Sequence, residues 1–504
     1  MPGAAARGGA WQFEPLEKRI LLSADPVQFL ATLTDIDGDG VDEVIVGTHD
    51  AEQAGEQRGE VRVLSGADGS VLHTFAGEGQ DSRFGWAVGD GGDLDGDGVH
   101  EIAVGAPGDG TLTFFSGSTG EVLVTLAGGQ AGDGFGSSFA AAGDLNGDGY
   151  ADWLVGVPGS DAASADGGEI QAVSGQWLAD AASTDAGAGD YLLDVWSGAA
   201  PGVQVGSTLV ALGDLDGDGD EDFAFGSAAS GTLTLASWDN GGLQTQRVIS
   251  GAGAVLAPVD DLDGDGIGDL LVGAPLAEGA GGEQAGSVTA LSGAYLMGLE
   301  NSGDGVLWSI SGDSAGDQLG AAVLGVGDFD GAGVSDVLVG SPGSNGPAGS
   351  AVNAGAVLLV SGADGAVLGE YGGPTVGGSF GAGLVANGTE DGDVLVSGTM
   401  GAGLLGWGDE GGGDDTYNPG GGLTFDEDTA AAIRAGLDGL DAWMTALEDF
   451  DELDMVLPVA NQSLGDLLEL GQEITLLLNQ VVDWLEDPTV TFATSALADL
   501  LSSL

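Results

Sequence analysis

Short apolar runs recur along the chain, and each follows an acidic, glycine-rich segment. Within a run every position is hydrophobic, which is typical of a strand that is covered on both faces. A glycine follows each run directly, so the runs are too short for helices and are expected to be β-strands. The five clearest runs are Val44–Val46, Ile102–Val104, Trp153–Val155, Phe223–Phe225 and Leu270–Val272.

Two alternating strands joined by a tight turn follow several of these runs. One such hairpin pairs Val61–Leu64 with Val71–Phe75 across the turn Ser65–Gly69. Turn residues between alternating segments are a strong hairpin signal. Thr111–Phe115 with Glu121–Leu126, and Ala356–Val360 with Ala366–Tyr371, repeat the pattern. Each unit therefore contains four short strands, with the acidic segment between the first and the second.

The units recur with a period of about sixty residues. Their acidic segments begin at Asp35, Asp93, Asp144, Asp214, Asp261 and Asp328. A seventh, decayed unit keeps Val394–Val396 but retains only Asn387 and Asp393 as acidic-segment residues. Four-stranded units repeated in this way are the blades of a propeller. We therefore expect a mainly all-β fold over residues 27–410, a seven-bladed β-propeller of four-stranded blades whose last one or two units are degenerate.

Five acidic segments read Asp-x-(Asp/Asn)-Gly-Asp-Gly-x-x-(Asp/Glu). Side-chain oxygens at positions one, three, five and nine and the carbonyl of position seven would surround one cation, and glycines at positions four and six permit the tight curl. The expected ligands are Asp35, Asp37, Asp39, Val41, Glu43, Asp93, Asp95, Asp97, Val99, Glu101, Asp144, Asn146, Asp148, Tyr150, Asp152, Asp214, Asp216, Asp218, Asp220, Asp222, Asp261, Asp263, Asp265, Ile267 and Asp269. The sixth segment has Ala332 at position five, which leaves its metal binding open.

All of these donors are hard oxygens, which favours Ca²⁺ over zinc or copper. The first half of the pattern also matches an EF-hand loop, but an EF-hand requires a bidentate Glu at position twelve. Position twelve is Val46, Val104, Val155, Phe225 and Val272 in the five segments. The EF-hand interpretation therefore fails. Solvated acidic turns without a metal are the alternative, and the number of near-identical copies argues against them.

A Phe-Gly or similar pair precedes five of the segments, and Gly-Ala-Pro or a variant follows several. The pairs are Phe84-Gly85, Phe135-Gly136, Val205-Gly206, Leu319-Gly320 and Phe380-Gly381. Together with the acidic loop, these motifs resemble the FG-GAP repeat family, which includes the integrin alpha-chain propellers. The resemblance implies a propeller with calcium loops on one face, serving in adhesion or recognition. It implies a protein or glycan ligand on a propeller face.

The composition narrows the possible partners. The chain has 80 acidic and 8 basic residues and a net charge of −72. A surface this acidic repels nucleic acid and anionic membranes, so neither is expected as a partner. The chain has no cysteine, so disulfides cannot stabilise it. Calcium is expected to replace them in an extracellular setting, where the ion is abundant enough for weak sites.

The two ends of the chain differ from the repeats. Residues 1–26 contain Phe13–Pro26, which resembles the LEPR-XLL segment of large bacterial surface or secreted proteins and implies a sorting role; a disordered leader is the alternative. Residues 411–425 form a Gly/Asp-rich linker. Residues 426–504 carry apolar stripes at helical spacing and are expected to form a small α-helical region. It would dock on a partner or begin a longer chain, and no segment is apolar enough to span a membrane.

No catalytic constellation is recognisable in the sequence. The three histidines, His49, His73 and His100, lie in separate units without a nucleophile at a familiar spacing, and His100 is expected to be a surface residue. We therefore expect a non-enzymatic calcium-binding module, either extracellular or on the bacterial cell surface. The alternatives are the propeller part of a secreted hydrolase or lyase, or a spacer in a giant surface protein.

Overall fold

The computed structural model describes residues 11–14 and 29–407, with internal gaps. The gaps are residues 54–55, 68, 129, 131, 185–190, 216–218, 220, 228–230, 240, 251–254, 279–280, 300–304, 346–352, 374–377, 387–393 and 399–400. The chain divides into two compact units, Met1–Glu410 and Gly411–Leu504. The expected linker and C-terminal helices belong to the second unit and lie outside the described residues. So does most of the expected leader, apart from residues 11–14.

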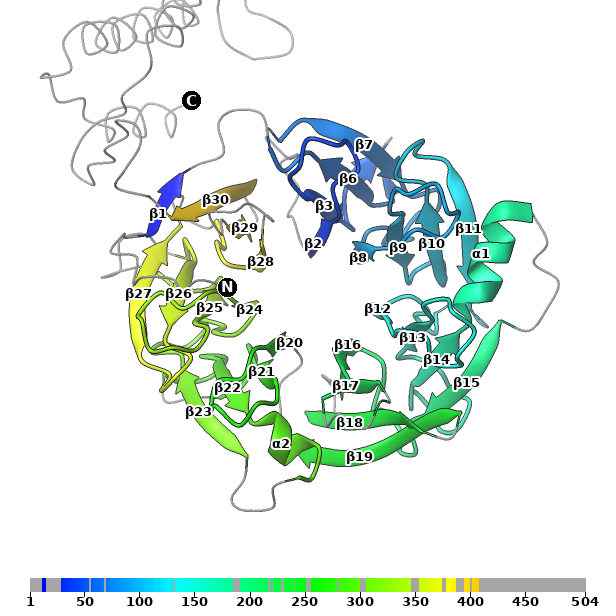
Figure 1. Ribbon diagram of the computed structural model, residues 1–504. Helices are drawn as coiled ribbons and strands as arrows, with labels where there is room; N and C mark the ends of the chain where they lie inside the picture. The colour runs from blue at the N-terminus through cyan, green and yellow to red at the C-terminus, as the bar shows by residue number, and fades with distance from the viewer. Residues whose placement is uncertain are drawn as a thin grey trace, which may run out of the picture. The chain divides into compact units, whose positions relative to one another are not determined.

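The first unit is a β-propeller of four-stranded antiparallel sheets arranged around an axis (Figure 1). Six blades each use one continuous segment of chain. The strands of the first three are β2 (Phe29–Leu33), β3 (Glu43–Thr48), β6 (Glu60–Leu64) and β7 (Val71–Ala76); β8 (Ala87–Asp90), β9 (Ile102–Ala106), β10 (Thr111–Phe115) and β11 (Val122–Ala127); and β12 (Phe139–Ala141), β13 (Trp153–Val157), β14 (Glu169–Val173) and β15 (Leu192–Ser197).

The next three blades repeat this order. Their strands are β16 (Thr208–Gly213), β17 (Asp222–Ser227), β18 (Thr232–Asp239) and β19 (Gly242–Ser250); β20 (Val255–Val259), β21 (Asp269–Gly273), β22 (Ser287–Leu291) and β23 (Val306–Ser311); and β24 (Val323–Gly325), β25 (Val337–Ser341), β26 (Ala356–Val360) and β27 (Val367–Gly372). All five apolar runs recognised in the sequence lie in the second strand of a blade.

The expectation of a seven-bladed propeller is corrected by the structure, which has six self-contained blades. The last repeat supplies only β28 (Gly383–Ala386), β29 (Val394–Gly398) and β30 (Gly401–Trp407). A fourth strand, β1 (Trp11–Glu14), pairs with β30, with Trp11 opposite Trp407. This last sheet is therefore composite, and its outer strand comes from the segment that the sequence analysis treated as a leader.

The structure also contains elements that the sequence analysis did not anticipate. Helix α1 (Gly175–Thr184) and the short helix α2 (Gly293–Leu296) connect the third and fourth strands of the third and fifth blades. A small hairpin, β4 (Glu52–Gln53) with β5 (Glu56–Gln57), extends the first blade. Within the described residues, no helix has the length and apolar character needed to cross a membrane.

The hydrophobic core lies between neighbouring blades rather than within any one of them. Phe114 of the second blade packs edge-on against Trp153 of the third, with ring centroids 5.2 Å apart. Both side chains belong to one buried cluster that also contains Phe135. Because each second strand is covered on both faces by adjacent blades, the run of residues after position nine is apolar at successive positions, as the sequence pattern predicted.

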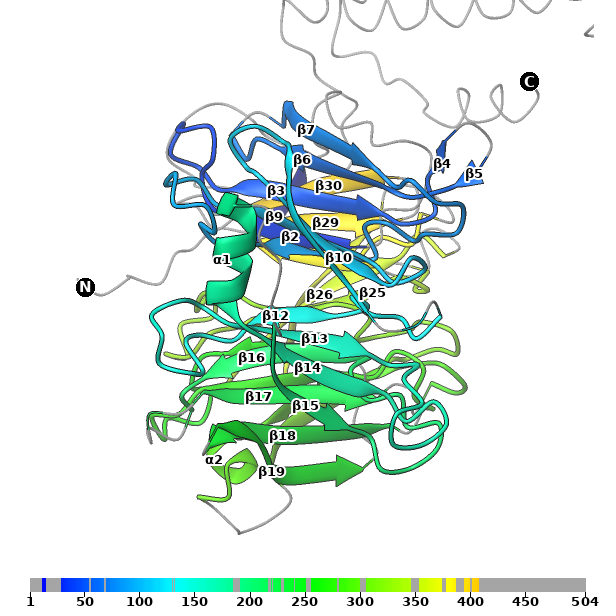
Figure 2. The ribbon, with the colours of Figure 1, turned by 90° about the vertical axis from the view of Figure 1, so that its right-hand side faces the viewer.

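The two ends of the propeller carry different connections. Antiparallel order places the loops between the first and second strands, together with α1 and α2, at one end, which we call the acidic end. The connections between the second and third strands and between successive blades lie at the other, which we call the opposite end. Figure 2 shows α1 and the β4–β5 hairpin at these two different ends.

Candidate metal centre

The acidic loops connect the first and second strands of the six blades, and we number them one to six from the N-terminus. In loop one, the N–H groups of Gly38 and Gly40 donate to the two carboxylate oxygens of Asp35, at 2.6 and 2.9 Å. Both glycines have left-handed backbones, with φ of +82° and +92°. Residues that carry a side chain rarely adopt this backbone conformation. Glycine at these two positions therefore allows the loop to curl around the Asp at position one.

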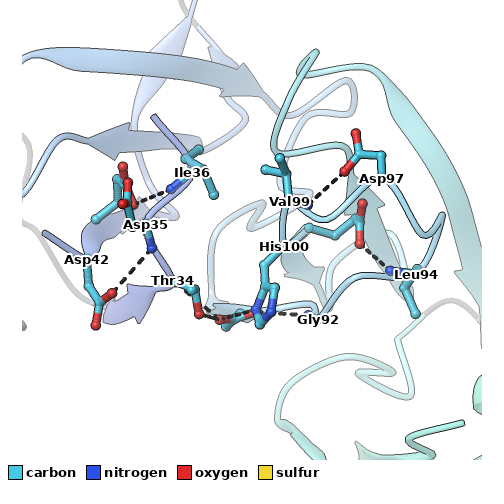
Figure 3. Close-up of polar contacts among 12 residues, drawn as sticks. Thr34, Asp35, Ile36, Asp42, Gly92, Leu94, Asp97, Val99 and His100 are labelled. Atoms are coloured by element: carbon cyan, nitrogen blue, oxygen red, sulfur yellow. Dashed lines mark hydrogen bonds and ion pairs between the residues drawn. The ribbon is translucent and has the colours of Figure 1, made fainter. Parts of the chain in front are cut away.

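The side chains at positions three and five form a second layer of local hydrogen bonds. Asp37 accepts from the N–H of Asp39 at 3.1 Å, and Asp39 accepts from the N–H of Val41 at 2.9 Å. Figure 3 shows the corresponding contact in loop two, where the N–H of Val99 donates to Asp97 at 2.8 Å. Each carboxylate uses only one oxygen for the backbone in these contacts.

Four of the loops gather three carboxylates with ligand atoms within 4.8 Å of one another. The clusters are Asp35, Asp37 and Asp39; Asp93, Asp95 and Glu101; Asp261, Asp263 and Asp265; and Asp328, Asp330 and Asp336. Unscreened carboxylates at this separation repel one another strongly, so a cation or bound protons must compensate them. The fourth cluster belongs to loop six, which gathers three carboxylates even though Ala332 occupies position five.

Position nine differs from the other acidic positions because its side chain is buried. Its six residues, Glu43, Glu101, Asp152, Asp222, Asp269 and Asp336, are at most 3% exposed. Asp152 accepts from the N–H of Leu145 at 2.9 Å and from that of Gly175 at 2.7 Å. The side chain at position nine therefore joins the acidic loop to the start of the connection after the third strand.

A serine that follows the third strand also contacts the loop. Ser65 donates to Asp39 at 3.2 Å, Ser118 to Asp97 at 2.7 Å, and Ser361 to Asp330 at 2.7 Å. The sequence analysis missed these residues, although Ser-Gly recurs after the third strand at Ser65-Gly66, Ser116-Gly117, Ser174-Gly175, Ser292-Gly293 and Ser361-Gly362. That recurrence is the signal that would have identified Ser65 and Ser361, whereas Ser118 lies two residues after the serine of its pair.

The glycine of each Ser-Gly pair is required by a close approach of two backbones. A Cβ on Gly175 would lie 2.0 Å from the carbonyl oxygen of Ala151, and one on Gly293 would lie 1.9 Å from that of Gly268. No side chain fits at such distances. The pair therefore holds the acidic loop against the outer half of its blade.

The geometry of these loops agrees with a comparison of the sequence with known families. The FG-GAP repeat model matches residues 84–125, 135–173 and 252–291. The three matches cover loops two, three and five together with the strands that follow them. The chain carries FG-GAP repeats.

The Phe-Gly pairs that begin the first two FG-GAP matches lie at the opposite end, where they join two blades. The N–H of Gly85 donates to the carbonyl of Gly105 in its own blade at 3.1 Å. The carbonyl oxygen of Gly85 would lie 2.2 Å from a Cβ on Gly47 of the preceding blade. Phe84, Phe135 and Phe380 are buried beside these contacts. The motif thus connects two neighbouring blades of the propeller.

Neighbouring acidic loops are connected at the acidic end as well. The Thr34 hydroxyl, next to loop one, donates to Asp90 at 3.0 Å, and His100 Nδ1 of loop two contacts the same carboxylate at 2.9 Å (Figure 3). Ser335 of loop six contacts Asp260, next to loop five, at 2.7 Å. His100 was expected to be a simple surface residue, whereas it belongs to this contact between blades.

The structure describes only some of the remaining expected ligands. Loop three repeats the hydrogen bonds of loop one, with Asn146 accepting from the N–H of Asp148 at 2.9 Å. In loop four, Asp214 accepts from the N–H of Gly219 at 3.1 Å, but Asp216, Asp218 and Asp220 lie outside the described residues. Metal coordination by the expected ligands, including the position-seven carbonyls of Val41, Val99, Tyr150, Asp220 and Ile267, remains a prediction.

The electrostatics of position nine indicate that a cation fits these loops. Burial raises the pKa of Glu101 to about 7, and the nearby carboxylates of loop two raise it further, although the N–H of Leu94 opposes the shift. Burial likewise raises the pKa of Asp269 to about 6. A carboxylate with a raised pKa is one whose ionised form lacks sufficient positive partners.

One buried atom supports the same conclusion. Glu101 Oε1 is inaccessible to solvent and has no hydrogen-bond partner within the described residues. Buried carboxylate oxygens are rarely left without a partner. Asp93 and Asp95 belong to the same cluster as Glu101. The residues of loop two therefore fit a divalent metal ion held by oxygen atoms.

Proposed function

We propose that this chain is a calcium-stabilised recognition module without catalytic activity. The observation that carries the proposal is the repetition of one oxygen-lined loop at the same end of successive blades. A catalytic site requires one special constellation, whereas these loops are near copies of one another. Copies on six successive blades favour a structural role for the ion and leave the connections of the propeller free to bind a partner.

Calcium is the ion that these donors favour. The loops offer carboxylate, amide and carbonyl oxygens and no nitrogen or sulfur ligand, which is the set that suits Ca²⁺. Calcium accepts six to eight oxygens in a flexible geometry, so the small differences between loops are tolerated. When bound, the ion supplies positive charge and cross-links the loop. Positions one, three, five and nine and the carbonyl of position seven would hold it.

The histidines support a non-catalytic interpretation. His73 Nε2 contacts the carbonyl of Gly117 at 2.8 Å, and its ring stacks on Phe75. His100 contacts Asp90, as described above. Burial lowers the pKa of His49, whose ring packs edge-on against Trp86 at 4.7 Å. Each histidine is thus engaged in packing or in a contact to a carbonyl or a carboxylate, and none is paired with a nucleophile within the described residues.

An extracellular or cell-surface location fits this function. FG-GAP repeats are typical of extracellular proteins, and their propellers are typically non-catalytic. Calcium outside cells reaches the concentrations that weak loops require. The net charge of −72 keeps such a module soluble and away from nucleic acid and anionic membranes. The expected ligand is therefore a protein or a glycan bound on a propeller face.

The proposal is tested by measuring stability and binding on the same preparation. Calcium at 100 times Kd stabilises a folded state by about 2.7 kcal/mol per site. We therefore expect the melting temperature of the metal-stripped chain to rise by several degrees as calcium reaches millimolar levels. Magnesium at equal concentration is the matched control and should have a much smaller effect.

The recognition half of the proposal requires a separate readout. The calcium-loaded chain is applied to arrays of glycans and of extracellular proteins, with and without a chelator. Saturable binding that the chelator abolishes is the expected result. No binding on either array would favour a spacer, and turnover of an arrayed substrate would favour the hydrolase or lyase. An unchanged melting temperature in millimolar calcium would remove the metal from the proposal.

A further inference from the structure

A cavity of about 880 Å³ lies at the opposite end of the propeller, away from the acidic loops. Its walls come from the connections of the first to third blades and from the start of the fourth, between His49 and Ser207. Pockets that bind small molecules span roughly 300–1,000 Å³. The cavity is therefore large enough for an organic ligand, and none of its walls belongs to an acidic loop.

Several polar side chains of the cavity have no partner among the described residues. His49 Nδ1 and Asp50 Oδ1 are buried and lack a hydrogen-bond partner there. The exposed side chains of Gln57, Arg83 and Gln204 likewise form no hydrogen bond or ion pair with described residues. Buried polar atoms normally find a partner. These groups are consequently available to a ligand that offers both donors and acceptors.

The backbone holds side chains in the cavity at a conformational cost. Asp81, Arg83, Asp166 and Gln204 line the cavity and have left-handed backbones, with φ between 49° and 60°. This conformation costs a non-glycine residue roughly 1–2 kcal/mol. Gly134 adopts the same conformation on the cavity wall, so glycine would satisfy the fold. Gln318 and Ser379 share this conformation outside the cavity, so it is a general feature of these connections, and in the cavity it fixes the positions from which the four side chains extend.

An aromatic group provides the apolar part of the cavity. The Trp86 ring contacts His49 edge-on at 4.7 Å and Phe29 at 5.5 Å between ring centroids. The Arg83 guanidinium lies 5.3 Å from the centroid of the Trp86 ring. These neighbours fix the orientation of the indole at the cavity wall. A rigid aromatic ring beside hydrogen-bonding groups suits a ligand with one apolar face and a polar edge.

The charges of the cavity exclude an acidic ligand. Asp50, Asp81, Asp133 and Asp166 line it, against the single arginine Arg83. Burial lowers the pKa of His49, which keeps the ring uncharged at neutral pH. The surplus of carboxylates repels anions, as does the acidic chain as a whole. A neutral ligand with hydroxyl groups can instead accept from Arg83 and donate to the carboxylates.

We propose that this cavity binds a neutral oligosaccharide, with one sugar ring against Trp86 and its hydroxyl groups on Arg83, Gln204 and the surrounding carboxylates. The apolar face of a sugar ring matches the indole, and its hydroxyls match the mixed donors and acceptors. The inference rests on the proposed recognition function and names the ligand class. It also distinguishes the cavity from the acidic end, which would bind only the metal.

The test titrates the full, calcium-loaded chain with maltotriose, cellotriose and N-acetylated chitotriose, followed by calorimetry and tryptophan fluorescence. Trigalacturonate is the anionic comparator and a Lys-Arg-Lys peptide the cationic one. At least one neutral trisaccharide should bind saturably and change the fluorescence, and trigalacturonate should not. Preferential binding of trigalacturonate or of the peptide would overturn the assignment to a neutral sugar.

Matched variants locate the site. Gln204→Ala should weaken trisaccharide binding about three- to ten-fold, as expected for one lost hydrogen bond. Gln318→Ala is the control, because Gln318 has nearly the same backbone angle (φ 57° against 55°) but does not line the cavity. Trp86→Ala should abolish binding, and Trp86→Phe should retain part of it. Equal losses in Gln204→Ala and Gln318→Ala would place the site elsewhere.

The outcomes separate this inference from the function on which it rests. If no trisaccharide binds at millimolar concentration while the protein array gives calcium-dependent binding, the sugar assignment fails and the recognition function stands. If the trisaccharides and both arrays are all negative, both proposals fail. The melting temperature of each variant in calcium is compared with that of the unmodified chain, so that a folding defect is not mistaken for lost binding.

Discussion

Both ends of the propeller contain left-handed backbone positions, but different residue types occupy them. At the acidic end the left-handed positions are glycines, such as Gly147 and Gly149, and the loops are near copies of one another. At the opposite end glycines such as Gly85 and Gly206 are left-handed as well, but so are Arg83, Gln204 and Gln318. Glycine minimises strain, whereas a side chain at such a position costs stability. The acidic end therefore avoids this strain among its described residues, whereas the opposite end accepts it at several positions, of which Arg83 and Gln204 line the cavity.

The largest expected effect is a dependence of stability on pH, which arises from the buried carboxylates of the acidic end. Folded Glu101 has a pKa of about 7 and Asp269 of about 6, against 4.5 and 3.8 as ordinary values, because both are buried. The folded state therefore binds protons more tightly than the unfolded chain. The stabilisation from this tighter proton binding is fully present at pH values below the ordinary pKa values. It is lost as the pH rises through 6 to 7, and it amounts to at most about 3 kcal/mol for each group.

Metal-stripped protein should consequently melt at a higher temperature at pH 5 than at pH 8. In saturating calcium the trend should reverse, because protons then compete with the ion for the same carboxylates. Thermal unfolding across this pH range, with and without calcium, measures both slopes. A metal-stripped protein that becomes more stable as the pH rises would contradict the description of position nine.

The second effect compares two acidic positions within loop three. Asp152→Ala removes the acceptor for two buried N–H groups, of Leu145 and Gly175, and should cost about 2–5 kcal/mol even without calcium, with a further loss in calcium because position nine is also an expected ligand. Asp148→Ala changes an exposed side chain that accepts from the N–H of Tyr150. It should lower stability mainly when calcium is present. Urea unfolding of both variants, with and without calcium, separates a residue that stabilises the loop through hydrogen bonds from one that acts mainly through the ion. Identical losses of stability in the two variants under both conditions would refute the distinction.

Loops of this kind could be anticipated from the sequence because all their contacts are local. The side chain at position one binds N–H groups three and five residues later, so spacing alone encodes the curl. The second strands were equally clear, since a strand covered on both faces is apolar throughout. What depends on distant partners was missed, such as the pairing of Trp11–Glu14 with β30. The cavity was also missed, because its walls join connections that lie far apart in sequence. Helix α1 escaped notice because it interrupts a repeat whose other copies have tight turns.

The third effect concerns the close approach that the Ser-Gly pair permits. In Gly175→Ala the new Cβ would lie 2.0 Å from the Ala151 carbonyl oxygen, so the backbone must move, at a cost of about 1–3 kcal/mol. Gly327→Ala is the control at the same end, because its Cβ would meet nothing within 4 Å. The control should change stability by no more than about 0.5 kcal/mol. Equal destabilisation in the two variants would show that the close approach is not what selects glycine.

The smallest effect on stability is expected at the opposite end, and it bears most directly on the comparison. Gln204→Gly relieves a left-handed backbone but makes the unfolded chain more flexible, so the two contributions oppose each other. We expect the free energy of unfolding to change by less than about 1 kcal/mol. Binding of the neutral trisaccharide should nevertheless weaken, since the amide is lost.

Gln318→Gly, at the equivalent position outside the cavity, should show the same small change in stability and no change in binding. If Gln204→Gly instead destabilised the protein strongly, the Gln204 side chain would be a structural element and the contrast between the two ends would disappear. If stability rose while binding fell, the left-handed side chain would be retained for contact with the ligand, at the expense of the fold.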